Sequence, residues 1–235
     1  MESCSIAQAA GADRIELCDN QETGGTTPSL GFIKAARKIL QIPLFPIIRP
    51  RNGDFLYTTA EFECMKTDIL LCKNSGCDGV VFGILYADGT VDKERCAALV
   101  SIAYPMEVTF HRAFDRTNDP FAAMQHIIHI GCQRILTSGQ QPTAIEGINV
   151  VAKLMEEAKG RIVIMPGSGI RSNNISMLLQ KTNADEIHSS ATKLAKSKMM
   201  YCNPALKDNA TYAIADHHEI AAMKTILNNF QHSGD

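Results

Sequence analysis

Apolar positions along this chain follow two spacings, and the change from one to the other recurs at intervals. Short runs of β-branched and aromatic residues, such as Val108 to Phe110, follow the two-residue period of a buried strand. Between these runs, apolar residues stand three or four positions apart, as they do along one face of a helix. Strands that alternate with helices in this way predict parallel βα units.

An internal repeat marks the points where helices end and strands begin. Its four copies start at Gly11, Gly76, Gly131 and Asn183, and each follows a helical pattern and precedes an apolar run. The first position of each copy needs a left-handed backbone to end the helix, which suits Gly and is tolerated by Asn. Because a further strand lies between consecutive copies, each repeat contains two βα modules, and four repeats predict a (β/α)8 TIM barrel.

Only seven of the eight expected strands can be found in the sequence. They cover residues 14–18, 43–50, 79–85, 107–114, 134–139, 161–167 and 186–190. Residues 3–10, which precede the first of these strands, have a helical pattern. We therefore expect a TIM barrel over residues 1–199 whose N-terminal first strand is absent or is supplied by residues outside this sequence.

The C-terminal part, residues 200–235, is predicted to form a loop and a helix that pack on the barrel or on a partner subunit. Residues 192–215 lack periodicity, which indicates a loop, and Asp216 can cap the helix that follows. The apolar stripe of this helix consists of Ile220, Met223, Leu227 and Phe230. Because this stripe has to be buried, we expect a homodimer.

Composition excludes several classes of protein. The formal net charge is -2, hydrophobic residues make up 45% and charged residues 20% of the 235 positions. This balance gives no electrostatic footprint for nucleic acid, and no apolar run is long enough to span a membrane. The eight cysteines form no CxxC pair and no export signal is visible, so we expect a cytoplasmic protein with mostly buried thiols.

Candidate chemistry gathers where the predicted strands end, because parallel α/β proteins bind ligands at the carboxyl ends of their strands. In the strand 14–18, alternation turns Glu16 and Cys18 into the barrel, although a salt-bridged Glu and a helix-facing Cys are an equally open interpretation. Arg49 and Arg51 share a face at the end of the next strand, and their guanidinium groups suit carboxylate or phosphate. Ion pairing with Glu16 or Asp54 is the alternative for these arginines.

The strand 107–114 ends in a cluster of His111, Arg112 and Asp115. A histidine in a core is by default satisfied by hydrogen bonds, but the carboxyl end of a strand favours a functional role for this one. We therefore predict proton transfer or metal binding for His111, and anion binding for Arg112.

Two turns late in the chain predict an anion site. The first contains Gly167, Ser168 and Gly169 and leads into a helix, which is where many barrels hold phosphate. The second turn adds Ser189 and Ser190. Neither turn has the Lys of a Walker loop or the spacing of a dinucleotide fingerprint.

At these residues the chain resembles the bacterial copper homeostasis protein family CutC. The matching segments, spread in the family's order over almost the whole chain, are RIELC (14–18), GGTTPS (24–29), IRPRNGDF (48–55), TFHRAFD (109–115), LTSG (136–139), GSG (167–169) and HSSA (188–191). The resemblance implies a (β/α)8 barrel, a cytoplasmic location, a homodimer and a role in copper handling. The family begins with a Glu-x-Cys strand that this sequence lacks, so only Cys18 remains of its two early cysteines, and Thr26 stands where Leu is usual.

Two functional classes remain open from the sequence. In the first, soft donors from Cys18, His111 and His188 converge on Cu(I), which prefers thiolate and imidazole. In the second, the barrel is an enzyme for a small phosphorylated or carboxylated substrate, whose anion the arginines and the two turns hold. Glu16 and His111 then transfer protons beside Arg49. An interaction protein with an inactive barrel is a third, weaker interpretation.

Overall fold

The computed structural model describes residues 1–203, 205 and 211–231 of the chain. Its parallel strands are β1 (Ile15–Leu17), β2 (Leu44–Pro46), β3 (Gly79–Phe82), β4 (Glu107–Phe110), β5 (Arg134–Thr137) and β6 (Val163–Pro166). Its α-helices are α1 (Glu2–Ala9), α2 (Leu30–Ile39), α3 (Thr59–Asn74), α4 (Lys93–Ala103), α5 (Pro120–Ile130), α6 (Ile148–Ala158), α7 (Ile175–Thr182) and α8 (His217–Gln231). Two short 3-10 helices, η1 (Gln21–Thr23) and η2 (Arg112–Arg116), follow β1 and β4.

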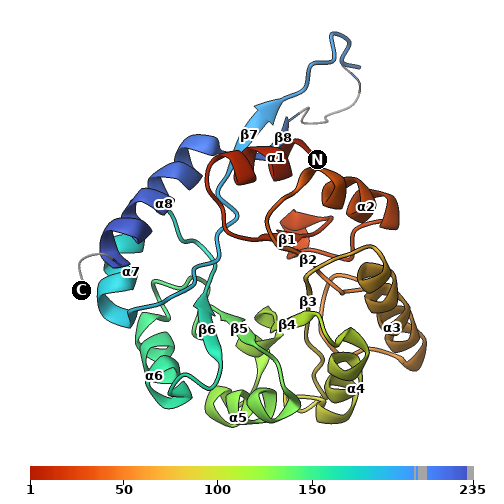
Figure 1. Cartoon of the computed structure of the whole chain (residues 1–235), viewed down its shortest axis with the longest axis vertical. Coiled ribbons are helices and arrows are strands. Elements are labelled where there is room, and N and C mark those ends of the chain that lie inside the picture. Colours follow the sequence, from red (N-terminus) through yellow and green to blue (C-terminus); the bar gives the residue numbers. More distant parts are fainter. Residues whose placement is uncertain (204, 206–210, 232–235) are drawn as a thin grey trace.

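The parallel strands form one curved array inside a ring of helices (Figure 1). β1 pairs with β2, the strands β3 to β6 pair in sequence order, and a parallel bridge between Ile47 and Val81 joins the two sheets. Residues 186–190 continue the array beyond β6, where the His188 amide donates to the Pro166 carbonyl over 2.9 Å. This arrangement confirms the predicted TIM-barrel fold.

The barrel is open at one seam, between residues 186–190 and β1. Within the described residues, no backbone hydrogen bond crosses this seam. Side chains span it instead: Arg14 Nη2 lies 2.6 Å from Glu186 Oε2, and His188 Nε2 lies 3.3 Å from Glu16 Oε2. The predicted strand 186–190 is therefore extended chain without a full ladder, since one of its edges faces no strand.

Apolar side chains pack on both faces of the strands. Leu17 belongs to the large outer layer, between strands and helices, whereas Phe45, Ile47 and Val81 fill the barrel interior with Cys18 against them. The predicted alternation in the first visible strand is therefore confirmed. All four repeat positions, Gly11, Gly76, Gly131 and Asn183, have positive φ at the end of a helix, as predicted.

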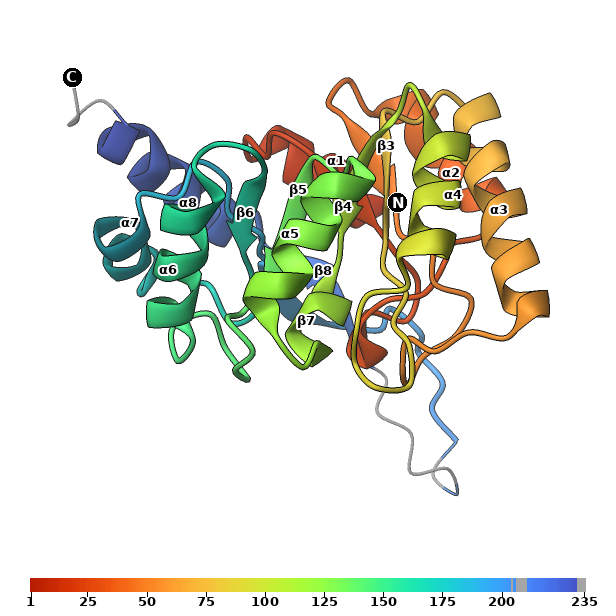
Figure 2. The same ribbon diagram turned by 90° about the horizontal axis from the view of Figure 1, so that it is seen from below.

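Residues 192–215 contain an antiparallel hairpin, so their prediction as a loop is wrong. β7 (Thr192–Lys196) pairs with β8 (Thr211–Ala215), and the hairpin projects from the ring of helices (Figures 1 and 2). Most of its side chains are not buried, so the sequence shows no alternation, and pairing between distant segments defines the strands. The pairing joins residues on both sides of the predicted domain boundary after residue 199. Residues 204 and 206–210 of the predicted loop lie outside the described residues.

The C-terminal helix α8 packs on its own chain. Asp216 accepts a hydrogen bond from the His218 amide at its start (3.1 Å), as predicted for a cap. Met223, Leu227 and Phe230 of the predicted stripe join a cluster with α7. The stripe therefore needs no second subunit to bury it, and the homodimer stays a prediction. None of the described helices is both long and apolar enough to cross a membrane.

Candidate functional site

His111 lies at the carboxyl end of β4, where the strand passes into η2, and it is only 4% exposed. Its Nδ1 accepts a hydrogen bond from the Ala113 amide (3.2 Å). The proton of the neutral ring must then be on Nε2, which is buried and has no protein partner in the described part of the chain. Burial, and then the positive charge of Arg49, lower the pKa of His111 to about 3. The side chain is therefore a neutral hydrogen-bond donor.

Arg49 is as deeply buried as His111 and holds two loops in place. Its Nη1 donates to the carbonyls of Thr23 (3.1 Å) and Gly25 (2.8 Å), and its Nη2 donates to that of Gly53 (3.1 Å). The guanidinium lies 5.0 Å from the Phe55 ring centroid, and the Phe55 and His111 rings lie 4.9 Å apart. Arg49 Nε is buried without a protein partner among the described residues. Arg49 thus keeps one donor atom without a partner, on a side chain that faces the Tyr57 hydroxyl and whose positive charge acts on His111.

Arg51 has a structural role that competes with the predicted contact to an anion. Its Nε lies 2.6 Å from Glu61 Oε1 and its Nη2 lies 2.9 Å from Asp54 Oδ1. A further bond runs to the Leu56 carbonyl (2.8 Å). Ion pairing with Asp54, the alternative considered from the sequence, is present. Arg51 lines a hollow of about 310 Å³ over the loops that follow β1 and β2, outside the barrel interior.

Glu16 and Cys18 lie on the inner face of the barrel, at and just after β1. One Glu16 carboxylate oxygen faces His188, and the other, Oε1, is buried without a partner among the described residues. Cys18 is partly exposed and packs beneath Gly25, where an added Cβ would lie 3.4 Å from its sulfur. Burial, then the negative charges of Asp19 and Glu16, raise the pKa of the Cys18 thiol to about 11. Cys18 is therefore protonated at neutral pH.

Arg112 and Asp115 join β4 to the loop after β5. Arg112 Nε lies 2.8 Å from Asp115 Oδ2, and its Nη2 donates to Ser138 Oγ over 2.7 Å. Asp115 also accepts from the amides of Ser138 (3.0 Å) and Gln140 (3.1 Å) and from the Thr137 hydroxyl (2.5 Å). The sequence placed Asp115 in the cluster but did not show that it fixes this loop. Arg112 is 41% exposed and keeps a free side toward solvent.

The glycine-rich turn after β6 keeps part of the predicted anion site. The Gly167 amide donates to the Thr137 carbonyl (2.9 Å), so it is removed from the predicted set. Across the described chain, the amides of Ser168 and Gly169 donate to no protein acceptor, and both residues have positive φ. Ser189 Oγ donates to the Ile170 carbonyl (2.8 Å), and Ser190 is exposed beside it. Two amides and two arginines, Arg49 and Arg112, thus remain open to an anion.

The structure does not bring Cys18, His111 and His188 together as metal ligands. Within the described residues, no three His, Cys, Asp or Glu side chains form a group that could hold a metal ion. His111 cannot offer the Nε2 lone pair while its Nδ1 accepts from Ala113, since moving the proton to Nδ1 would set two donors against each other. The expected convergence of soft ligands on copper is therefore wrong for these three residues.

Thr109 is a member of the site that the sequence analysis did not single out. It precedes His111 by two positions on the same face of β4, and its hydroxyl is fully buried without a partner in the described chain. The same alternation that selected His111 selects Thr109 as well. Four buried polar atoms thus belong to the barrel interior and have no partner among the described residues: Glu16 Oε1, Arg49 Nε, Thr109 Oγ1 and His111 Nε2.

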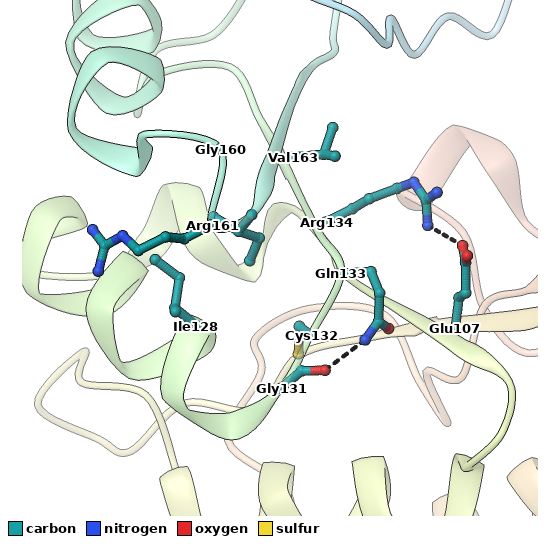
Figure 3. Close-up of a pocket in the computed structure, with 10 residues that line it drawn as sticks. Glu107, Ile128, Gly131, Cys132, Gln133, Arg134, Gly160, Arg161 and Val163 are labelled. Carbon is teal, nitrogen blue, oxygen red and sulfur yellow. Dashed lines mark hydrogen bonds and ion pairs between the residues drawn. The ribbon is translucent and has the colours of Figure 1, made fainter.

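A pocket of about 480 Å³ lies at the opposite, amino end of β4, β5 and β6 (Figure 3). Arg134 on its wall turns to the carboxylate of Glu107, and the Gln133 side chain donates to the Gly131 carbonyl (2.8 Å). None of the residues predicted for the site contributes to its lining. Its polar groups are already paired, which separates it from the carboxyl end of the barrel.

Comparison with known proteins gives the same picture. A family model described as the CutC family matches residues 1–193. The human protein named copper homeostasis protein cutC homolog is 46% identical over 92% of this chain and 80% of its own length. A family protein CutC from Parabacteroides distasonis is 51% identical over 86% of this chain and 84% of its own.

Solved structures agree in fold. A crystal structure from Streptococcus agalactiae, described as a copper homeostasis protein CutC, superposes with a TM-score of 0.73 at 35% identity and covers 76% of this chain and 88% of its own. Thiamine phosphate pyrophosphorylase from Pyrococcus furiosus shares the fold alone, with a TM-score of 0.58 at 16% identity over 97% of this chain and 89% of its own. From the family model and these relatives, we conclude that the chain belongs to the CutC family.

Proposed function

We propose that this protein acts in copper homeostasis in the cytoplasm and that its barrel binds a small phosphorylated or carboxylated molecule at the carboxyl end. Membership of the CutC family, whose human member is named for copper homeostasis, supports the role. The four buried polar atoms without protein partners inside the barrel support the ligand. Buried polar groups are normally hydrogen-bonded, so several of them on the inner side of the barrel wall indicate something that completes their bonds.

The types of these atoms indicate which ligand fits. His111 Nε2 and Arg49 Nε are donors, and with the amides of Ser168 and Gly169 they suit the oxygens of a phosphate or carboxylate. Glu16 Oε1 and the Thr109 hydroxyl can accept hydrogen bonds from hydroxyl groups of the same molecule. The site is therefore suited to a molecule with an anionic end and a hydroxylated body.

If the site is an enzyme's, its acid–base chemistry falls to Glu16. His111 has a pKa of about 3 and stays neutral at physiological pH, so it orients a substrate oxygen by donating a hydrogen bond. Glu16 has one free carboxylate oxygen in the barrel and lies beside His188, 3.3 Å away, which can exchange protons with it. This assignment changes the predicted role of His111 from proton transfer to positioning.

Cu(I) binding at Cys18 is a second candidate. The acidic neighbours that raise the pKa of Cys18, Asp19 and Glu16, favour a cation beside its sulfur. The donor set fits copper poorly, however, because the structure offers a single thiol there and His188 faces Glu16. We therefore consider Cu(I) binding at Cys18 the weaker of the two proposals, after binding of the small anionic ligand. The homodimer is also part of the proposal, on the resemblance to the family alone.

Titration with inorganic phosphate, followed by calorimetry, tests the ligand site, and malonate serves as the carboxylate probe in a second series. We expect binding that weakens about 10-fold or more in His111→Phe, since a hydrogen bond to a charged group is worth about 1.5–3 kcal/mol. His129→Phe, on an exposed position of α5, is the matched control and should bind like the unchanged chain. Equal affinity for both variants, or no binding of either probe, would contradict the proposal.

A further inference from the structure

Strand β3 turns two glycines toward the barrel interior. Gly79 is its first residue and Gly83 follows its last, and Val81 between them packs inside the barrel, so alternation turns all three positions inward. Neither glycine has a positive φ, so the backbone at both positions would accept an ordinary side chain. A glycine in a strand costs stability relative to alanine. The inner side of the barrel must therefore need the space that these two glycines leave.

The space beside Gly83 is filled by the imidazole ring of His111. A Cβ added to Gly83 would lie 2.8 Å from His111 Nδ1, 3.0 Å from its Cε1 and 3.0 Å from the Cβ of Ala113. The backbone of His111 is fixed at this place, because its amide donates to the Phe82 carbonyl over 3.0 Å. His111 is only 4% exposed, so its ring has little room to move away. The ring thus takes a place that any side chain on Gly83 would occupy.

Two aromatic rings also lie beside the imidazole of His111. The centroid of Phe55 is 4.9 Å away and that of Phe110 is 6.2 Å away. Phe55 is tied to the segment that follows Gly83, because the Leu85 amide donates to the Phe55 carbonyl over 3.0 Å. The ring of His111 is therefore surrounded by groups that backbone hydrogen bonds hold in place, and a push from one side moves it out of its position.

The atom that an added Cβ would meet first is also the atom that fixes the proton of the ring. His111 Nδ1 accepts a hydrogen bond from the Ala113 amide over 3.2 Å, so the hydrogen of the neutral imidazole is on Nε2. A Cβ on Gly83 would push Nδ1 away from this amide, and the Nε2 hydrogen would turn with the ring. The empty space at Gly83 therefore determines both the tautomer of His111 and the direction of its donor.

We propose that Gly83 is a positioning residue of the ligand site, because its missing side chain admits the His111 ring and keeps the Nε2 donor turned to the barrel interior. This role rests on the proposed function only for the ligand that receives the hydrogen bond. An imidazole held in this tautomer can only donate at Nε2, so it fits an oxygen that only accepts, as in an ionised phosphate or carboxylate. Gly83 itself contacts no ligand and acts through His111.

Gly79 leaves the same kind of space for a ring with a structural task. A Cβ there would overlap the ring of Phe45, which packs in the barrel interior with the guanidinium groups of Arg14 and Arg134 over it. Replacing Gly79 disturbs packing at the amino end of β3 and leaves His111 in its position. Gly79→Ala is therefore the matched control, because it separates loss of packing from loss of the donor.

The test is a calorimetric titration of the full chain and its variants with inorganic phosphate. We expect Gly83→Ala to weaken phosphate binding about 10-fold or more, as the loss of a hydrogen bond to a charged group does. Gly79→Ala should bind phosphate like the unchanged chain. In a His111→Ala background no ring meets the added Cβ, so Gly83→Ala should weaken binding no further.

Nitrogen NMR of His111 measures the positioning itself and needs no ligand. In the unchanged chain we expect a hydrogen on Nε2 and none on Nδ1. In Gly83→Ala the signals of Nδ1 and of the Ala113 amide should shift, whereas Gly79→Ala should keep them. If phosphate does not bind the unchanged chain, the proposed function fails, and this spectrum still decides the role of Gly83.

Two results of the titration would overturn the role of Gly83. One is a Gly83→Ala chain that binds phosphate like the unchanged chain, and the other is an equal loss of binding in the His111→Ala background. The spectrum can overturn it as well, if Gly83→Ala leaves the signals of Nδ1 and Ala113 where they were. A hydrogen on Nδ1 in the unchanged chain would do the same, and this result holds even if Gly83→Ala does not fold.

Discussion

The two ends of the barrel differ in whether their buried polar groups have partners. At the amino end, Arg134 binds Glu107 and Glu186, and Arg14 binds Glu186 from the other side of the seam. Both guanidinium groups also lie over the Phe45 ring, at 5.1 and 5.6 Å from its centroid. Apart from Arg14 Nε, the charged atoms described here are satisfied by one another.

At the carboxyl end, by contrast, buried polar atoms of the interior lack partners among the described residues. Glu16, Thr109 and His111 each keep one such atom, although Arg49 and Asp115 fix the loops around them. One end of the barrel is therefore completed by its own side chains, and the other is rigid but incomplete. The difference teaches that pairing, and not the presence of charged residues, separates a structural network from a binding site.

The largest expected effect is at the paired end. Glu186→Gln removes the one carboxylate that two partly buried arginines share. It should lower the free energy of unfolding by about 3 kcal/mol, because Arg14 then loses its charged partner away from full contact with water. Urea unfolding measures the change. Glu63→Gln, which breaks an exposed pair with Lys66, should cost less than about 1 kcal/mol. Equal costs would show that the amino-end network is no more than surface pairing.

Next in size is the substitution Asp115→Asn. It weakens the hydrogen bonds that the carboxylate accepts from Arg112 and the loop after β5, and we expect a loss of about 2 kcal/mol in the free energy of unfolding. Asp88→Asn in an exposed turn is the control and should change the free energy of unfolding much less. A loss as small as the control's would mean that Asp115 does not hold the loop.

The dependence of stability on pH tests the carboxyl end of the barrel through His111. The pKa of His111 is about 3 in the folded chain and 6.5 ordinarily. Between pH 3 and pH 6.5 the unfolded chain therefore binds a proton at this histidine and the folded chain does not. Stability should therefore fall as the pH drops below about 6.5, by at most about 2 kcal/mol between pH 7 and pH 5. His111→Gln should flatten this part of the profile in urea unfolding, and an unchanged slope would remove His111 as its source.

The smallest effect is the most diagnostic one. Thr109→Val replaces a buried hydroxyl that has no partner in the described part of the chain. The free energy of unfolding should therefore change by less than about 0.5 kcal/mol, while phosphate binding weakens. Thr67→Val, on the surface of α3, controls for the change in side-chain type. If Thr109→Val instead costs more than about 1 kcal/mol, the hydroxyl has a structural partner and the contrast between the two ends is lost.

The sequence predicted the barrel because its signals are local. Helix-ending Gly76 and Gly131 and the alternation around Glu16 and His111 depend on neighbouring residues, and the structure confirms them. Arg51 was predicted to share a face with Arg49, but the chain bends at Pro50 and Arg51 pairs with Asp54 and Glu61. The hairpin of β7 and β8 was missed because its strands meet only across a long separation in the chain.

The same limit applies to the site. Position along a strand predicted that His111 faces inward, but the bond from Ala113 that fixes its proton on Nε2 arises from the turn into η2. This case needs the geometry of the backbone as well as the pattern of residues.

The seam between β1 and residues 186–190 is the place where, within the described residues, the wall of the barrel is joined by side chains alone. A ring joined throughout by backbone ladders resists widening equally at every strand, whereas this ring meets across the seam through Arg14 with Glu186 and Glu16 with His188. If the wall of the barrel widens, we therefore expect it to part at this seam first. Because an ion pair between Arg14 and Glu186 spans the seam, added salt should weaken the contact between its two sides.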